Sequence, residues 1–315
     1  MRVGQNPAKA IDQVPQPARV TVAVVCYIPF LSGYYSGSLD VLQACLQSIW
    51  ENTPQPYDLL VFDNASCPEV REYLTRLHTD GRIQYLILSD KNIGKGGAWN
   101  MIFQGAPGEI IAYADSDVQF RPGWLERSLE IIETYPNVGM VTACPLRTPE
   151  KFYSSTLDWA RQETLATLEQ GQFMSWEVFK EHNDSLGVEE VTAAQWFDES
   201  HDWRMEYRGI VAYAGAAHFQ FTSPKRALSP VFPLQMDRPM GQVRLLDQIL
   251  NEGGCLRLNT PEVLVRHLGN RLIGAGVATP AQKASKTRTR GFWDLPPVRR
   301  VLMWLYNQVF KLYHK

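Results

Sequence analysis

The 315-residue sequence has few of the features that mark secreted, membrane-spanning or repeat proteins. Its five cysteines are odd in number and far apart, and the absence of a Cys-x-x-Cys pair argues against a disulfide framework or a zinc site. No uninterrupted apolar run reaches the length that spans a bilayer, and residues up to Pro17 lack an apolar signal core. We see no internal repeat. These absences favour a globular protein in a reducing compartment, and we expect it to be cytoplasmic.

The sequence also lacks a strong net charge. The whole-chain value of −2 gives no attraction to nucleic acid, so we expect no nucleic-acid partner. The charge is uneven, however, because eight basic residues and one acidic residue follow Ala281, a net charge of +7. A basic tail on an acidic body hints at an anionic membrane surface or an acidic partner.

Strand-like and helix-like segments alternate along the first half of the chain. Apolar, β-branched runs predict buried strands at 19–27, 58–62, 83–88 and 138–143. Apolar residues at helical spacing predict helices at 38–50, with Ser38 as N-cap, 68–78 and 122–135. This alternation indicates an α/β fold with a parallel sheet and right-handed crossovers. Since polar clusters follow the strands, they should meet at one sheet edge and form a nucleotide site.

The stretch from Glu109 to Asp117 is an apolar run that ends in two carboxylates. Asp115 and Asp117 are two residues apart, and such residues in a strand face the same side. At the carboxyl end of a strand, two carboxylates suit Mg²⁺ or Mn²⁺ that bridges to phosphate oxygens. The alternative is a polar turn in which Asp115 caps a helix that Pro122 begins.

The alternation stops near Pro145. Residues 150–205 have a helical, aromatic pattern, and strand-like or helical segments follow at 207–222, 242–251, 255–258 and 262–267, before a glycine-bearing flap at 269–276. Residues 297–314 predict an amphipathic helix with one apolar face. This helix either packs on protein or lies in the headgroup layer, which would make the protein peripheral at the cytoplasmic membrane face.

In this order the polar segments resemble those of the family 2 glycosyltransferases, over about residues 20–270. Cys45–Ser48 with Val61–Ser66 is similar to the family's first helix and uracil-contacting loop. Asn92-x-Gly94-x-x-Gly97-x-x-Asn100 looks like the second nucleotide segment, and Asp115-Ser116-Asp117 like the metal motif. The segment Asp247–Leu250, before Gly253 and Gly254, resembles the helix that bears the catalytic base, and Val265–Gly269 the strand end whose histidine approaches the metal.

The resemblance implies a GT-A fold, a mostly parallel twisted sheet flanked by helices, and inversion at the anomeric centre. Asp63 would accept from the base N–H, Asp115 would hold the ribose, and Asp117 with His267 would bind Mn²⁺ or Mg²⁺. Asp247 would take the proton from the acceptor hydroxyl. Lys95 would add a cation near the phosphates, and the remaining nucleotide-sugar contacts are expected from Cys26, Asn92, Gly94, Asn100 and Ser116.

The expected organisation follows from the same resemblance. Residues 1–18 form a flexible arm, 19–144 a nucleotide-sugar-binding half, 145–280 an acceptor-binding and catalytic half, and 281–315 a basic linker with the amphipathic helix. The donor would be a UDP- or GDP-sugar carrying a hexose, and the acceptor a saccharide or a lipid-linked hydroxyl in polysaccharide or glycolipid biosynthesis.

Two departures from the family pattern leave alternatives open. The family usually has Glu before the base, where this chain has Leu246, so Asp237 is the alternative base. The loop from Ile28 to Gly37 is longer and more aromatic than usual. A nucleotidyltransferase is the second enzyme class, although Cys26–Phe30 is not the glycine-rich and basic loop that it needs. A catalytically silent nucleotide-sugar-binding module is the third alternative.

Overall fold

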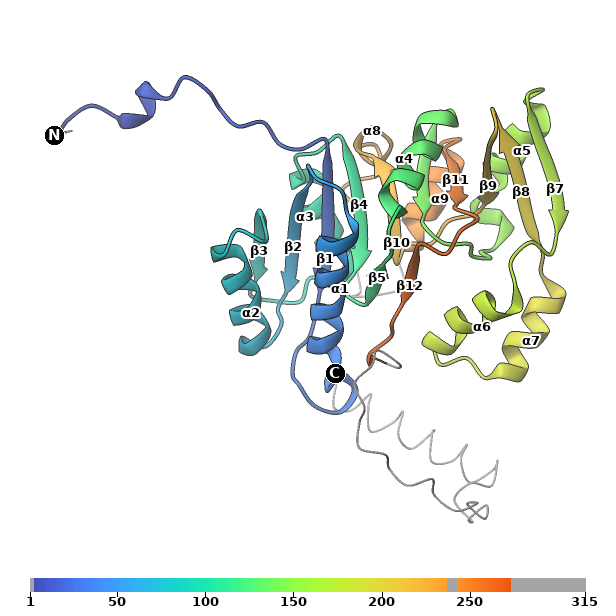
Figure 1. The fold of residues 1–315 in the computed structure, drawn as a ribbon, viewed down its shortest axis with the longest axis horizontal. Coiled ribbons are helices and arrows are strands. Elements are labelled where there is room, and N and C mark those ends of the chain that lie inside the picture. The colour runs from blue at the N-terminus through green and yellow to red at the C-terminus, as the bar shows by residue number, and fades with distance from the viewer. Residues whose placement is uncertain (1–2, 237–242, 273–315) are drawn as a thin grey trace, which may run out of the picture. The chain divides into compact units, whose positions relative to one another are not determined.

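The computed structural model describes residues 3–236 and 243–272, and all structural statements concern these residues. Its first part alternates strands and helices as predicted (Figure 1). The strands are β1 (Val20–Cys26), β2 (Asp58–Asn64), β3 (Tyr85–Ser89), β4 (Ile110–Asp115), β5 (Val118–Phe120) and β6 (Val138–Thr142). The α-helices are α1 (Ser38–Asn52), α2 (Pro68–Thr79), α3 (Gly94–Gly105) and α4 (Trp124–Thr134).

The second part mixes short helices with strands. The strands are β7 (Ala166–Gly171), β8 (Asp202–Tyr207), β9 (Ile210–Ala214), β10 (Gln220–Pro224), β11 (Leu256–Asn259) and β12 (Val265–His267). The α-helices are α5 (Ser154–Gln162), α6 (Trp176–Ser185), α7 (Glu190–Glu199), α8 (Lys225–Leu228) and α9 (Arg244–Glu252). Short 3₁₀ turns are found at Pro7–Ala10, Gly33–Tyr35 and Glu150–Phe152.

Ten strands form one mixed sheet in the order β3-β2-β1-β4-β10-β6-β11-β9-β8-β7. Strands β3, β2, β1 and β4 are parallel, whereas β10 runs antiparallel between β4 and β6, and β7, β8 and β9 form an antiparallel meander. The register of β10 places Gln220 opposite Ala114. The segment just before β10 therefore lies beside the carboxyl end of β4, and β5 pairs separately with β12.

The core consists of two apolar layers, one on each face of the sheet. Along β1, Val20, Val22 and Val24 pack with α1, α2 and α4, whereas Ala23 and Val25 pack with α3 and α9. This alternation follows from the two-residue period of a strand. Figure 1 shows α1 lying across β1 in this view. The α/β fold class is confirmed, and its helices cover both faces of the sheet as the GT-A expectation required.

Several local predictions were wrong. Residues 150–205 contain β7 and β8 between helices, because both strands lie in the edge meander, where exposed positions interrupt the apolar pattern. Ser38 is the first residue of α1 and Gly37 occupies the cap position, so Ser38 is not the N-cap. Strand β4 ends at Asp115, and Ser116 and Asp117 form a turn, so strand alternation does not orient Asp117.

Other sequence predictions concern parts of the chain outside the described residues. These are the amphipathic helix at 297–314, the basic tail, the alternative base Asp237 and the end of the expected flap at 269–276. Among the described residues, no helix is long and apolar enough to cross a membrane. All five cysteines are free thiols, and four of them are buried, which agrees with the prediction that they are small core residues.

Candidate active site

A cavity of about 420 Å³ lies at the carboxyl ends of β1, β2 and β4. Its volume falls in the range of roughly 300–1,000 Å³ that is common for small-molecule sites. Seven of the residues expected from the sequence line it together: Cys26, Asn92, Gly94, Lys95, Asp115, Ser116 and Asp117. The parallel order of the strands explains this convergence, because the carboxyl ends of parallel strands meet at the same sheet edge.

An aromatic loop forms one wall of the cavity. Tyr27, Tyr34 and Tyr35 line the cavity, and the Tyr35 ring makes edge contacts with Tyr27 and Tyr34 at centroid distances of 6.2 and 5.1 Å. Edge-to-face contacts at such distances are favourable for aromatic rings. The sequence analysis did not select these tyrosines, although the unusual length and aromatic content of residues 28–37 signalled them.

Asn64, which the sequence analysis also did not select, shapes the loop before α3. Its Oδ1 accepts from the Ile93 N–H at 2.9 Å, and its Nδ2 donates to Asn92 Oδ1 at 2.9 Å. Asn92 Oδ1 also accepts from the Gly94 N–H at 2.8 Å. Gly94 has φ +74°, a left-handed conformation that favours glycine. The two asparagines therefore fix the backbone turn that brings Lys95 to the cavity.

Asp115 lies between a lysine and a tyrosine. Lys95 Nζ contacts Asp115 Oδ2 at 2.6 Å, and Tyr113 Oη donates to Asp115 Oδ1 at 2.5 Å. Burial, together with the Asp115 carboxylate, holds the pKa of Tyr113 well above its ordinary value, so the phenol stays protonated and donates. The alternative in which Asp115 caps a helix is wrong, because α4 begins at Trp124 with Gly123 in the cap position.

Asp117 and His267 converge, as a shared metal site requires. Asp117 Oδ2 lies 3.2 Å from His267 Nε2, and Asp117 Oδ1 is buried without a hydrogen-bond partner among the described residues. The Ser185 hydroxyl donates to the His182 carbonyl at 2.6 Å, so it accepts from His267 Nδ1–H at 2.9 Å. In the neutral imidazole the only N–H is then on Nδ1, so the lone pair on Nε2 is the one that can bind a cation. One carboxylate and one oriented imidazole fit a divalent cation.

This pair is not a complete ligand set by itself. No group of three or more His, Cys, Asp or Glu side chains that could hold a metal is found within the described part of the chain. Magnesium and manganese sites in phosphate-binding enzymes commonly use few carboxylates and take their other ligands from phosphate and water. Burial by itself lowers the pKa of His267, but the adjacent Asp117 carboxylate outweighs burial, so the pKa lies above its ordinary value.

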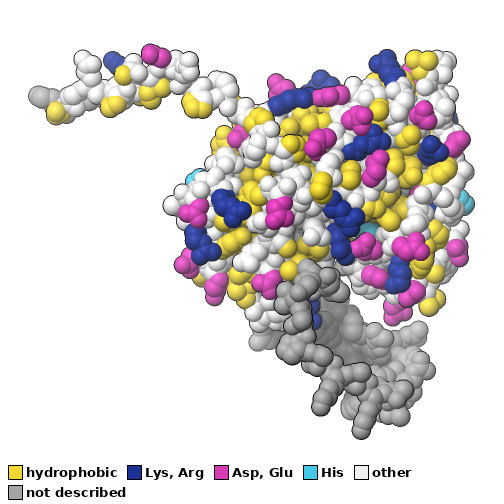
Figure 2. All heavy atoms as spheres, in the orientation of Figure 1, with side chains coloured by type: hydrophobic (Ala, Val, Ile, Leu, Met, Phe, Trp, Pro, Cys, Tyr) yellow, Lys and Arg dark blue, Asp and Glu magenta, His cyan; other side chains and the backbone are white. Residues whose placement is uncertain are grey.

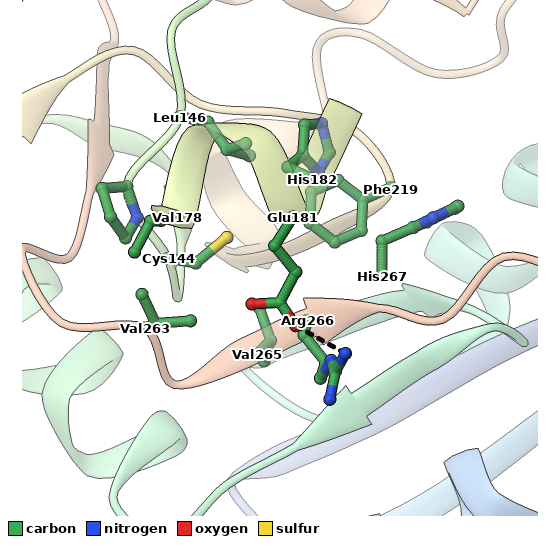
Figure 3. A pocket seen from close by; sticks show the side chains of 11 residues that line it. Cys144, Leu146, Val178, Glu181, His182, Phe219, Val263, Val265, Arg266 and His267 are labelled. Carbon is green, nitrogen blue, oxygen red and sulfur yellow. Dashed lines mark ion pairs between the residues drawn. The ribbon is translucent and has the colours of Figure 1, made fainter. Parts of the chain in front are cut away.

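A second, smaller pocket of about 20 Å³ adjoins His267 (Figure 3). The rings of His182 and Phe219 lie 6.3 and 5.7 Å from the His267 ring. Burial, assisted by the charge of His267, lowers the pKa of His182 to about 4, so His182 is neutral at pH 7. This pocket is too small for a sugar, and its side chains form a packed wall that positions His267.

Two predicted nucleotide contacts lie outside the cavity lining. Asp63 is fully buried, accepts from the Ser66 N–H at 3.1 Å and lies 3.6 Å from Arg71 Nε. Asn100 donates to the Leu234 carbonyl at 2.8 Å and accepts from the Leu234 N–H at 2.7 Å. Both side chains are engaged in holding neighbouring backbone, which favours a positioning role for each.

Asp247 also lies away from the cavity lining, in the first turn of α9. Its Oδ1 accepts from Arg257 Nη2 at 2.7 Å, and its Oδ2 lies 3.2 Å from His218 Nδ1. The sequence analysis identified neither Arg257 nor His218. No local pattern could have found them, because three separate elements bring the three side chains together.

The sequence relationship agrees with this geometry. Residues 34–185 match the family described as Glycosyl transferase family 2. This segment belongs to glycosyltransferase family 2. The match covers α1, the Asn92 segment and the Asp115–Asp117 turn, and it confirms the resemblance found in the sequence.

Two curated glycosyltransferases are similar to part of this chain. An uncharacterized glycosyltransferase from Nostoc sp. is 28% identical over 100 residues, which are 32% of this chain and 31% of the relative. The glycosyltransferase AglE from Haloferax volcanii is 27% identical over 113 residues, 31% of this chain and 37% of the relative. The chain thus aligns with about a third of the length of each relative.

Solved glycosyltransferase structures show a more distant likeness. The mannosyltransferase PcManGT from Pyrobaculum calidifontis, in complex with GDP-Man and Mn²⁺, has a TM-score of 0.45 at 17% identity and matches 80% of this chain and 58% of its own. Residues 1–349 of TarS from S. aureus, in complex with UDP-GlcNAc, have a TM-score of 0.44 at 11% identity and match 78% of this chain and 56% of TarS.

Proposed function

We propose that this protein transfers a hexose from a nucleotide diphosphate sugar to a hydroxyl acceptor, with a divalent cation bound and with inversion at the anomeric carbon. The observation that carries the proposal is one cavity lined by seven predicted residues, which come from the end of β1, the Asn92 segment and the Asp115–Asp117 turn. Membership of residues 34–185 in glycosyltransferase family 2 supports the reaction class.

The cavity lining offers two kinds of chemistry. The tyrosines at 27, 34 and 35 provide aromatic faces, which suit a nucleoside. Lys95, Asp115 and Asp117 provide charged groups, where the ribose and the diphosphate would bind. Asp117 and His267 would hold the cation, which when bound supplies positive charge to the diphosphate leaving group. Lys95 would add a second positive charge near the diphosphate.

Inversion follows from one displacement at the anomeric carbon, in which the acceptor attacks from the face opposite the leaving diphosphate. A sugar hydroxyl is a weak nucleophile, so a positioned base must remove its proton during the attack. The sequence resemblance assigns a part in this step to Asp247 of α9. Arg257 and His218 hold its carboxylate at 2.7 and 3.2 Å in a fixed orientation.

Release of nucleoside diphosphate tests the proposed function. The full chain is incubated with UDP-glucose, UDP-N-acetylglucosamine or GDP-mannose, with methyl glycosides as acceptors and Mn²⁺ in the buffer. We expect release with at least one donor, a loss of release in EDTA, and a product whose anomeric configuration by NMR is inverted. Tight donor binding without release would support the silent binding module, and a retained configuration would contradict inversion.

A further inference from the structure

A series of three polar side chains runs from the core to the surface beside the cavity. Arg257 is at its buried end, with a side chain that is 1% exposed. Asp247 is in the middle, 7% exposed, and His218 is at the outer end with 31% of its side chain exposed. The series therefore presents an imidazole to solvent and keeps its carboxylate inside the protein.

The environment of Asp247 limits what its carboxylate can reach. Both oxygens have partners, Arg257 Nη2 at 2.7 Å and His218 Nδ1 at 3.2 Å. Arg257 is itself fixed, because it also donates to the carbonyls of Ala216 at 2.7 Å and Phe152 at 2.6 Å. A general base must come within hydrogen-bond reach of the proton it removes. Asp247 has 7% of its side chain exposed and both oxygens engaged, so His218, with 31% exposed, is the member of the series that an acceptor hydroxyl can reach more readily.

The same contacts set the hydrogen positions on His218. A carboxylate paired with Arg257 can only accept, so Nδ1 of His218 carries the hydrogen that it donates to Asp247 Oδ2. In the neutral ring the lone pair is then on Nε2, at the ring edge opposite Asp247. A buried carboxylate that orients an imidazole and stabilises its protonated form is a recurrent arrangement for general base catalysis.

His218 also lies at the right place in the fold. It precedes Phe219, whose carbonyl accepts from the Asp115 N–H at 2.8 Å. Its ring lies 6.3 Å from the ring of Trp99, and Lys95 Nζ lies 5.3 Å from the centre of that same ring. These contacts place His218 close to Lys95 and Asp115, two residues of the cavity lining at which the sugar diphosphate is proposed to bind. The tyrosine wall belongs to the loop after β1.

We propose that His218 Nε2 is the base that removes the acceptor proton, and that Asp247 is a positioning residue for it; this inference rests on the proposed function. As the acceptor oxygen forms its bond to the anomeric carbon, the bond from that carbon to the diphosphate oxygen breaks. The bonding electron pair leaves with the nucleoside diphosphate. The hydroxyl proton moves to His218 Nε2 and is later released to solvent, so the histidine returns to its neutral form.

Two changes at His218 test its role with the donor that the wild-type protein uses. His218→Gln retains a polar side chain without a proton-accepting nitrogen, and it should lower kcat by about 10²–10⁴-fold, the usual contribution of a general base. Calorimetric Kd values for UDP and GDP in Mn²⁺ should stay within about twofold, since His218 would face the acceptor. His201→Gln, at an exposed histidine without a place in the site, is the matched control and should leave kcat unchanged.

Chemical rescue separates catalysis from structural damage. In His218→Ala, free imidazole should restore a substantial part of the lost kcat, which a folding defect would not permit. Asp247→Asn should lower kcat without a change in donor Kd, and it should weaken imidazole rescue when combined with His218→Ala, because the carboxylate orients the ring.

Two results would overturn the inference. One is a near-wild-type kcat in His218→Gln while Asp247→Asn abolishes turnover, which would make Asp247 the direct base. The other is a His218→Ala protein that loses activity and gains nothing from imidazole. Failure of the proposed function looks different, because the wild-type protein itself would release no nucleoside diphosphate; the inference would then fall with it.

Discussion

At the scale of single residues, Asp117 gives the clearest indication of a cation site. Its Oδ1 is buried and has no hydrogen-bond partner within residues 3–236 and 243–272. A buried oxygen without a partner costs free energy, on the order of 1–3 kcal/mol, unless something binds it. His267 Nε2 and Asp117 Oδ2 are 3.2 Å apart, so one cation can contact both side chains.

We therefore expect metal-dependent binding through these two residues. Asp117→Ala and His267→Ala should each weaken the binding of UDP or GDP in Mn²⁺, while binding measured in EDTA should be the same as for the wild type. Isothermal titration calorimetry with and without Mn²⁺ provides the measurement. Asp198→Ala, at an exposed carboxylate of α7, is the matched control. Undiminished binding in Mn²⁺ would remove both residues from the proposed metal site.

At the scale of elements, one buried arginine connects three parts of the second half. Arg147 contacts the two carboxylate oxygens of Asp202 in β8 at 2.9 and 3.1 Å. It also donates to the Phe197 and Ser200 carbonyls at the end of α7, at 2.8 and 2.9 Å, and to Gln172. Both partners of the ion pair are buried, with 6% and 3% of their side chains exposed. Arg147 thus links the end of α7 and the segment after β7 to β8.

Removing one partner of this pair should be strongly destabilising. Arg147→Met leaves the Asp202 carboxylate buried without its cation, and such changes cost about 3–5 kcal/mol. Urea unfolding should show a lower midpoint with an unchanged slope. The control is Arg161→Met, which breaks an exposed pair with Asp158 and should change the free energy of unfolding by less than about 0.5 kcal/mol. Equal midpoints for the two variants would contradict the argument.

At the scale of the whole molecule, charge is distributed unevenly along the chain. Figure 2 shows acidic and basic side chains close to one another on the drawn face of the described residues. The residues after Ala281 carry a net charge of +7 and include residues 297–314, for which the sequence predicts an amphipathic helix. Each basic residue near an anionic membrane contributes on the order of 1 kcal/mol to attachment.

We predict that this tail brings the protein to anionic membranes. In vesicle sedimentation at low salt, the full chain should bind phosphatidylserine vesicles more strongly than a chain that ends at Gly291. The full-length variant Arg299→Glu, Arg300→Glu, Lys311→Glu should also bind weakly, and neutral vesicles should bind little of any protein. Equal partitioning of all three proteins on anionic vesicles would favour a tail that packs on protein.

The sequence by itself determined the alternating α/β part of the fold and seven of the residues that line the cavity. Strand and helix periodicity depends on residues a few positions apart, so β1, β2 and α2 could be predicted nearly to the residue. The polar clusters that follow the strands lie close together because the carboxyl ends of parallel strands lie at the same edge of the sheet. Glycines and asparagines at fixed spacing marked the Asn92 loop, whose backbone turn needs them.

Only the tertiary structure decided that the imidazole of His218 is exposed while the carboxylate of Asp247 is buried. The antiparallel insertion of β10 between β4 and β6 places Phe219, the residue after His218, against Asp115. Arg257 lies on β11, which pairs with β6, and contacts Asp247 from there. Strand pairing depends on contacts between residues about 100 positions apart, which no local periodicity encodes. The Asp247 carboxylate, which looked available in the sequence, is engaged in the fold, because Arg257 of β11 and His218 of the turn before β10 both reach it.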